Sequence, residues 1–203
     1  MENTIGKEFV EMTKYRNLEP SPQSKGAPLP PLQTPLPESA RLIDLPAGNA
    51  FDPGLLDFKS LVENRETLRK YTDSPLSLEE LAYLLWGTQG VKSVTEKPVS
   101  KRTVPSAGSR HAFETYLLIN NVEGLEPGLY RYLALEHKLA KLEAPEDINT
   151  ILTEACLKQL HVKNSAVTFI WAAVPLRMTW RYCQRGYRYL YLDAGHVCQN
   201  LYL

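Results

Sequence analysis

The sequence predicts one domain of the α/β class, in which helices and strands enclose a single core. Three observations lead to this prediction: a helix with clear start and stop signals near Ser77, several short runs rich in strand-forming residues after it, and an uninterrupted apolar run over residues 165–176. With 203 residues, 43% of them hydrophobic, the chain is long enough to bury one substantial core.

Composition excludes several classes of protein. Lys+Arg and Asp+Glu both number 23, so the net charge is zero and no global field attracts nucleic acid or an anionic membrane. No apolar run approaches the roughly 18–20 residues of a spanning helix, and the charged N-terminus lacks the apolar stretch of a secretory signal. Three widely spaced cysteines fit reduced thiols. We therefore expect a cytoplasmic protein with no membrane or nucleic-acid partner.

The first 50 residues predict an N-terminal arm or linker, separate from a domain over residues 51–203. Residues 19–50 are rich in proline, which fixes φ and lacks an N–H donor, so we expect this segment to be extended rather than helix or strand. A flexible linker and an arm that wraps over a partner subunit both fit, and composition does not separate them.

The elements of the domain follow from capping and turn signals. Residues 58–67 predict a short amphipathic helix. The clearest helix has Ser77 as N-cap and Glu80 closing a capping box, and its buried stripe and stop signals are Leu81, Leu84, Leu85, Gly87 and Gly90. After a loop at 101–111, the sequence predicts strands at 114–122, 128–135 and 138–142, a helix at 147–159, and a central strand within 165–176 that is buried on both faces.

The last predicted element is one helix from about Met178 to Leu203. The apolar residues on one face are Leu190, Ala194, Val197 and Leu201. No stop signal follows, and the chain ends on apolar Leu-Tyr-Leu. We expect either a fragment of a longer protein or an end that packs into another subunit, and we favour a fragment.

Several candidate sites in the sequence have weak support. Four arginines at helical spacing, Arg177, Arg181, Arg185 and Arg188, could form a nucleic-acid stripe, but the neutral chain favours a solvated or subunit-bridging face. His196 and Cys198 match no zinc-site spacing, so we predict no metal. The sequence has no GxSxG elbow, no GxGxxG after a strand and no P-loop.

Arg65, Thr67 and Arg69 form a more specific pattern, R-x-T-x-R. A phosphate dianion is bound well by two planar, permanently charged guanidinium groups with a hydroxyl between them. The alternative is an ordinary solvated face, because charged pairs at this spacing are common on helices. Spacing alone leaves both interpretations open.

Four segments in order resemble the nitroreductase family of FMN-dependent oxidoreductases, and more closely its SagB-type branch, which includes azoline dehydrogenases of peptide maturation. The similarity covers roughly Leu55 to Leu203, and the segments are NRETLRKY, SPLSLEELAYLLWGTQG, RTVPSAGSRHAFETYLLI and YRYLYLDAGHVCQNLYL. It implies an α+β sandwich with a mostly antiparallel central sheet flanked by helices, an obligate homodimer, and FMN at the dimer interface. It also implies that the family's C-terminal strand region is absent here.

The resemblance assigns roles to individual residues. The family's phosphate-binding segment falls on Arg65, Thr67 and Arg69. The loop that approaches the flavin, typically from the partner subunit, falls on Pro105, Ser106, Ala107, Gly108 and Ser109, with serine at the last position where many members have asparagine. A catalytic Lys-Tyr pair of azoline dehydrogenases aligns with Arg181 and Tyr182, and arginine does not act as a base as lysine can.

The resulting prediction is an FMN-dependent oxidoreductase with a ping-pong cycle. A donor such as NAD(P)H passes a hydride to FMN N5 and leaves, and a small-molecule or peptide-derived acceptor replaces it. Tyr182 is a candidate proton donor. The alternatives are an azoline dehydrogenase, a non-catalytic dimeric scaffold that binds a peptide or protein partner, and a nucleic-acid module that uses the arginine stripe.

Overall fold

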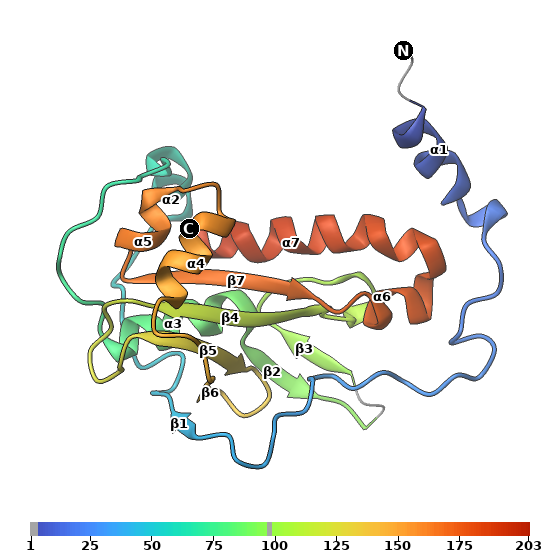
Figure 1. The fold of residues 1–203 in the computed structure, drawn as a ribbon. Coiled ribbons are helices and arrows are strands. Elements are labelled where there is room, and N and C mark those ends of the chain that lie inside the picture. Colours follow the sequence, from blue (N-terminus) through green and yellow to red (C-terminus); the bar gives the residue numbers. More distant parts are fainter. Residues whose placement is uncertain (1–3, 97–98) are drawn as a thin grey trace.

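A computed structural model describes residues 4–96 and 99–203 (Figure 1). Its centre is one antiparallel sheet in which every neighbouring pair of strands is antiparallel. In spatial order the strands are β1 (Leu42–Asp44), β6 (Lys138–Lys141), β5 (Gly128–Leu133), β4 (Phe113–Ile119) and β7 (Val167–Ala173). A separate hairpin joins β2 (Val91–Val94) to β3 (Ser100–Arg102). This central antiparallel sheet with flanking helices confirms the predicted fold class.

Helices lie along the sheet and at its ends. The described α-helices are α1 (Ile5–Met12), α2 (Phe58–Asn64), α3 (Leu78–Gln89), α4 (Ile148–Ala155), α5 (Leu160–Asn164), α6 (Pro175–Tyr182) and α7 (Gly186–Tyr202). Short 3₁₀ turns are η1 (Tyr15–Asn17), η2 (Ala107–Ser109) and η3 (Cys183–Arg185). Figure 1 shows α7 running along β7, with α6 beyond one end of this strand and α2 near the other.

The main core forms where α3 packs on one face of the sheet. Leu81 and Leu85 of α3 are fully buried against a set of strand residues, Leu117, Ile119, Tyr130, Tyr132 and Leu139. The predicted capping box fixes the start of α3: the Ser77 hydroxyl accepts the N–H of Glu80, and the Glu80 carboxylate accepts the N–H of Ser77. Gly90 ends the helix, whereas Gly87 lies inside it.

A second core cluster joins α6 and α7 to the start of β4. Met178, Leu190, Ala112 and Phe113 form it. Gly186 is needed for this packing, because a Cβ atom there would lie 3.1 Å from the Met178 carbonyl carbon. The predicted single last helix is wrong: the chain breaks at Cys183, whose φ of +48° and ψ of −140° cannot continue a helix.

Three further expectations about single elements are wrong. β7 is a half-buried edge strand rather than a central one, because it pairs with β4 alone among the residues that the structure describes. The helix expected at 147–159 ends at Ala155, after which Leu157 and Lys158 have positive φ and α5 begins separately. The expected loop at 101–111 begins inside β3.

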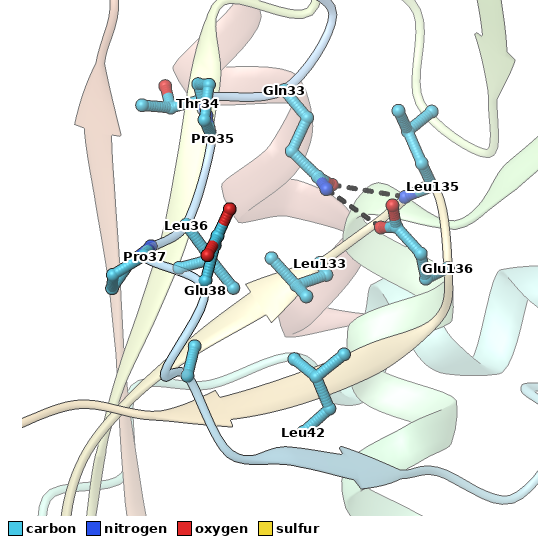
Figure 2. Close-up of a pocket in the computed structure, with 11 residues that line it drawn as sticks. Gln33, Thr34, Pro35, Leu36, Pro37, Glu38, Leu42, Leu133, Leu135 and Glu136 are labelled. Carbon is cyan, nitrogen blue, oxygen red and sulfur yellow. Dashed lines mark hydrogen bonds between the residues drawn. The ribbon is translucent and has the colours of Figure 1, made fainter.

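The proline-rich segment packs on its own domain, and residues 42–44 of it form β1, so the expectation of no strand there is wrong. We call residues 27–35 the strap. It crosses the sheet face opposite the main core, where Glu114 of β4 and Arg131 of β5 point. Figure 2 shows the strap beside the β5–β6 turn, where Gln33 hydrogen-bonds the Leu135 N–H and the Glu136 carboxylate.

A buried ion triad holds the strap. Glu114 accepts hydrogen bonds from Arg131, at 2.9 Å, and from Arg177, and all three side chains are at least 94% buried. Thr34 of the strap donates its N–H to the same carboxylate at 2.8 Å. The strap carbonyls of Pro31 and Thr34 accept from Arg177 and Arg131. The triad therefore ties strands, α6 and strap together.

Candidate functional site

The R-x-T-x-R residues lie on an exposed, non-helical segment. Asp57 caps α2 by accepting the N–H of Ser60 at 3.0 Å, and the helix ends at Asn64, so Arg65 leaves it with ψ of 117°. Arg65, Thr67 and Arg69 are all exposed. Among residues 4–96 and 99–203, neither Thr67 nor Arg69 has a side chain that makes a hydrogen bond or an ion pair. Their donors are thus free to meet a ligand.

Arg65 marks where this segment meets the end of α7. Its guanidinium carbon lies 6.0 Å from the centre of the Tyr202 ring. Both residues line a hollow of about 340 Å³, together with Asp57, Ser60 and Asn64 among others. Arg65 gives this hollow a cationic group, but the carboxylates of Asp57 and Glu66 also line it, and the Ser60 hydroxyl and the Asn64 amide already donate to the Asp57 carboxylate and the Ser60 carbonyl.

Residues Pro105–Ser109 form a tight, strained loop. Ser106 precedes η2 with extended backbone, and its hydroxyl accepts the N–H of His111 at 2.9 Å. Gly108 and Ser109 both have positive φ, 58° and 53°. Pro105 and Gly108 are exposed, whereas Ser106 and Ala107 are half-buried. The loop therefore presents one side to solvent and keeps the other against the protein.

Arg181 and Tyr182 lie directly beside this loop. A Cβ atom on Gly108 would come within 2.6 Å of the Tyr182 hydroxyl and 2.9 Å of Arg181 Cδ and Nε. The Tyr182 ring is held edge-on to Tyr189, with 4.6 Å between ring centres, and the Arg181 guanidinium lies 5.6 Å from the Tyr182 ring. The structure thus brings the two candidate catalytic residues to the loop expected to meet the flavin.

Asp193 of α7 holds the buried side of the loop. The sequence analysis did not identify it as a site residue. It is 4% exposed, and its Oδ1 accepts the N–H of Ala107 at 3.2 Å. Burial raises the pKa of this carboxyl, although the nearby Ser106 hydroxyl and the Ala107 N–H act to lower it. The sequence does carry a signal for it, because Asp193 is an acidic residue on the same helix face as the apolar Leu190 and Val197.

The two groups of predicted site residues are far apart in one chain. Arg65 lies against Tyr202 at one end of α7, and Tyr182 lies against Tyr189 near the other. Tyr202 lies thirteen positions after Tyr189 in this helix, which is about 20 Å at the α-helical rise. Figure 1 likewise shows α2 and α6 at opposite ends of the sheet.

The four arginines of the C-terminal region do not form one stripe. Arg177 is buried in the triad, and Arg181 lies beside Gly108. Arg185 donates to the Thr13 carbonyl at 2.9 Å, and Arg188 donates to the Thr13 hydroxyl at 2.6 Å, so both hold the N-terminal segment. The break at Cys183 separates the two pairs, because it turns the chain between α6 and α7.

Three further findings concern the described residues outside the predicted site. A cavity of about 420 Å³ between the strap and β5 has an apolar floor of Leu36, Leu42 and Leu133 and contains none of the predicted site residues (Figure 2). No cluster of three or more metal-binding side chains occurs in the part of the chain that the structure describes. Within that part, no helix combines the length and apolarity needed to cross a membrane.

Comparisons with known proteins give one consistent family. The sequence model of the Nitroreductase family matches residues 62–203. Over 148 residues, 73% of this chain and 72% of the relative, the chain is 35% identical to "Putative nitroreductase MJ1384" of Methanocaldococcus jannaschii. It is also 32% identical over 104 residues to the trifolitoxin-processing protein TfxB of Rhizobium leguminosarum bv. trifolii, which covers 49% of this chain and 28% of TfxB.

Solved structures agree at the level of the fold. A crystal structure of a "putative nitroreductase" from Anabaena variabilis superposes with a TM-score of 0.64 at 26% identity. The superposition covers 97% of this chain but only 37% of that one. The chain therefore spans about a third of the length of this structural relative.

Proposed function

Because the chain belongs to the nitroreductase family, we propose that it is a flavin-dependent oxidoreductase that binds FMN between two copies of itself. The observation that carries this proposal is the separation, along α7, of the exposed Arg65–Arg69 segment from the loop at Gly108. Two copies can place the segment of one beside the loop of the other. In one chain they lie near opposite ends of α7, beside Tyr202 and Tyr189, which are about 20 Å apart along the helix.

The donor set fits FMN. Arg65 and Arg69 are exposed guanidinium groups that can neutralise a phosphate dianion, and the free Thr67 hydroxyl can donate to it. Pro105 and Gly108 leave the outer side of the loop exposed next to Arg181 and Tyr182, where a planar ring can approach. When bound, FMN supplies hydride transfer from a donor such as NAD(P)H to an acceptor in a ping-pong cycle.

Exposed apolar side chains support the second copy. Large ones are rarely left uncovered in groups on a monomer. On α7, α6 and α2 and in the segments that flank α2, those at least 60% exposed are Tyr191, Leu192, Leu176, Phe58, Leu55 and Leu68. A homodimer that covers them would also complete the flavin site.

In this proposal the chain's own residues bind, orient and move a proton. Arg65, Thr67 and Arg69 hold the phosphate, and residues 105–109 of the partner copy orient the ring and exclude water from it. Tyr182, whose hydroxyl lies beside Gly108, would give a proton at its phenolic oxygen to the reduced acceptor. Arg181 next to it can attract an anionic substrate group, and it does not act as a base.

The first test measures flavin binding by the clamp. The double substitution Arg65→Ala/Arg69→Ala is compared with Arg41→Ala/Lys101→Ala, which removes the same charge at two exposed positions outside the site. We expect the clamp variant to weaken FMN binding on the order of 100-fold, the effect of losing two charge-assisted contacts. Equal FMN occupancy in the two variants would reject the clamp, and a colourless wild-type protein with no affinity for added FMN would reject the proposed function.

A second candidate is oxidation of azoline rings during peptide maturation. The similarity to the trifolitoxin-processing protein favours it. Arg181 in place of the lysine expected for azoline dehydrogenases weighs against it, since a guanidinium does not take up the proton. Incubation of thiazoline and oxazoline peptides with the wild type and with Arg181→Lys separates the two: turnover by wild type supports this candidate, and turnover by neither excludes it.

A further inference from the structure

Asp193 occupies an unusual position for an acidic side chain. It lies on the buried side of α7 between Leu190 and Val197 and is 4% exposed. Its Oδ1 accepts the Ala107 N–H, and its Oδ2 has no hydrogen-bond partner among residues 4–96 and 99–203. A carboxylate in such a place is unfavourable unless it makes a necessary contact. The contact that Asp193 makes is the hydrogen bond from Ala107, in the loop that precedes His111.

The loop requires such a contact because its backbone is strained. Gly108, Ser109 and His111 all have positive φ, and the last two carry side chains. Such conformations persist only where the surroundings fix them. Two hydrogen bonds do so on the inner side: Asp193 holds the Ala107 N–H, and the Ser106 hydroxyl holds the His111 N–H.

The outer side of the same loop is exposed at Pro105 and Gly108 and lies against Arg181 and Tyr182. The Ala107 N–H is occupied by Asp193 and is not available to a ligand. A shift of η2 would change the contact of Gly108 with the Tyr182 hydroxyl and Arg181. The conformation of the inner side therefore sets how the outer side meets its neighbours.

We propose that Asp193 is a positioning residue: it fixes the Ser106–Gly108 loop beside Arg181 and Tyr182, so that the outer side of the loop presents the correct backbone edge to the flavin ring. This inference rests on the proposed function for its ligand, but the loop conformation itself is a property of the protein without ligand. Asp193 acts through Ala107 and touches no reacting atom.

Two substitutions at this position separate the hydrogen bond from the buried charge. Asp193→Asn and Asp193→Leu both remove the charge, but only asparagine keeps an acceptor for the Ala107 N–H. Val197→Ala, at a 2% exposed residue of the same helix, serves as a control for general loosening of α7. Amide exchange over residues 104–111 is measured in the full chain without added FMN, and FMN affinity is measured by fluorescence titration.

We expect amide exchange in Asp193→Leu to be about tenfold faster than in Asp193→Asn over this segment, and its Kd for FMN to rise about tenfold, the size of one lost hydrogen bond to a polar acceptor. The asparagine variant should stay near the wild type. Equal exchange in the two variants, or the same changes in Val197→Ala, would overturn the positioning role. Faster exchange with an unchanged Kd would overturn the link to the flavin. A wild type that binds no FMN would refute the proposed function, while the exchange comparison would still decide whether Asp193 fixes the loop.

Discussion

Gly108 and Tyr182 are in such close contact that a Cβ atom on the glycine would lie 2.6 Å from the tyrosine hydroxyl. The two residues come from different parts of the chain, a strained loop before β4 and the end of α6. Their contact joins the loop expected to meet a flavin to the tyrosine expected to move a proton. The local geometry at Gly108 is therefore the most sensitive point of the candidate site.

Substitution of Gly108 by alanine should destabilise the protein more than the same change at another glycine with positive φ. Gly124, with φ of 75° and nothing within 4 Å of an added Cβ, is the matched control. There we expect only the conformational penalty of about 1–2 kcal/mol, whereas Gly108→Ala adds about 1–3 kcal/mol from the clash. Urea unfolding of both variants measures the difference. Equal losses would show that the contact with Tyr182 is looser than the structure indicates.

The buried triad predicts a large effect of losing its single acid. Glu114→Ala leaves Arg131 and Arg177 buried without a counter-charge, so we expect a loss of about 3–5 kcal/mol in the free energy of unfolding. The control is Glu126→Ala, whose ion pair with Lys141 is exposed and should matter little. Trypsin should also cut faster at Lys25 and Arg41, which flank the strap. A strap that stays protected in Glu114→Ala would mean that the proline-rich segment is held by other contacts.

Stability should fall as the pH drops below about 6.5, and His111 is a principal cause. Burial, followed by the positive charge of Arg102, lowers the pKa of His111 from 6.5 to about 3. Between these values the unfolded chain binds a proton that the folded chain does not, so the contribution of His111 to stability is full above pH 6.5 and is lost as the pH falls toward 3. The slope is at most about 1.4 kcal/mol per pH unit.

His111→Asn isolates this effect, because asparagine does not titrate and tolerates the positive φ of 42° at this position. The difference in unfolding free energy between the wild type and the variant should shrink from pH 7 to pH 4. Glu114 contributes in the same direction at lower pH: burial acts to raise the pKa of its carboxyl, but hydrogen bonds from Thr34 and Arg177 outweigh it and lower the pKa. A difference that does not change with pH would show that His111 takes up its proton in the folded state.

Arg185 and Arg188 should anchor the N-terminal helix rather than bind a ligand. Arg188 donates to the Thr13 hydroxyl and the Val10 carbonyl, and Arg185 to the Thr13 carbonyl. The double substitution to alanine should therefore speed tryptic cleavage at Lys14 and Arg16, with no change at Lys138 in the sheet. Cleavage at the wild-type rate would mean that the hydrogen bond between the Tyr15 and Tyr189 hydroxyls suffices to hold the helix.

Local signals in the sequence predicted much of this fold and little of its long-range assembly. The capping box at Ser77 and the β5–β6 hairpin involve neighbours in sequence, and both are confirmed. The apolar run at 165–176 has the same pattern whether it is a central strand or an edge strand beside a helix, so its place in the sheet could not be derived. The break at Cys183 has no glycine or proline to signal it.

In the candidate site, too, the local features could be predicted from the sequence and the long-range ones could not. The motif residues Arg65, Thr67 and Arg69 could be found from spacing and resemblance, but not their distance from Gly108, which depends on how α7 spans the domain. Asp193 reaches Ala107 across 86 positions of sequence, and Glu114 reaches Thr34 across 80. Contacts between residues so far apart in sequence depend on how the elements pack, and the pattern of a single sequence does not show this packing.

Tyr182→Phe should separate proton transfer from structure. The phenylalanine keeps the ring contact with Tyr189 and removes only the hydroxyl beside Gly108, so folding and FMN affinity should be unchanged. If the hydroxyl is the general acid of the proposed reaction, kcat should fall about 10²–10⁴-fold with a small change in KM, measured under steady-state conditions with saturating donor. Tyr187→Phe, on the exposed side of α7, is the control and should keep the wild-type rate. A kcat that is the same in both variants would assign the proton to solvent or substrate and leave Tyr182 a packing role against the loop.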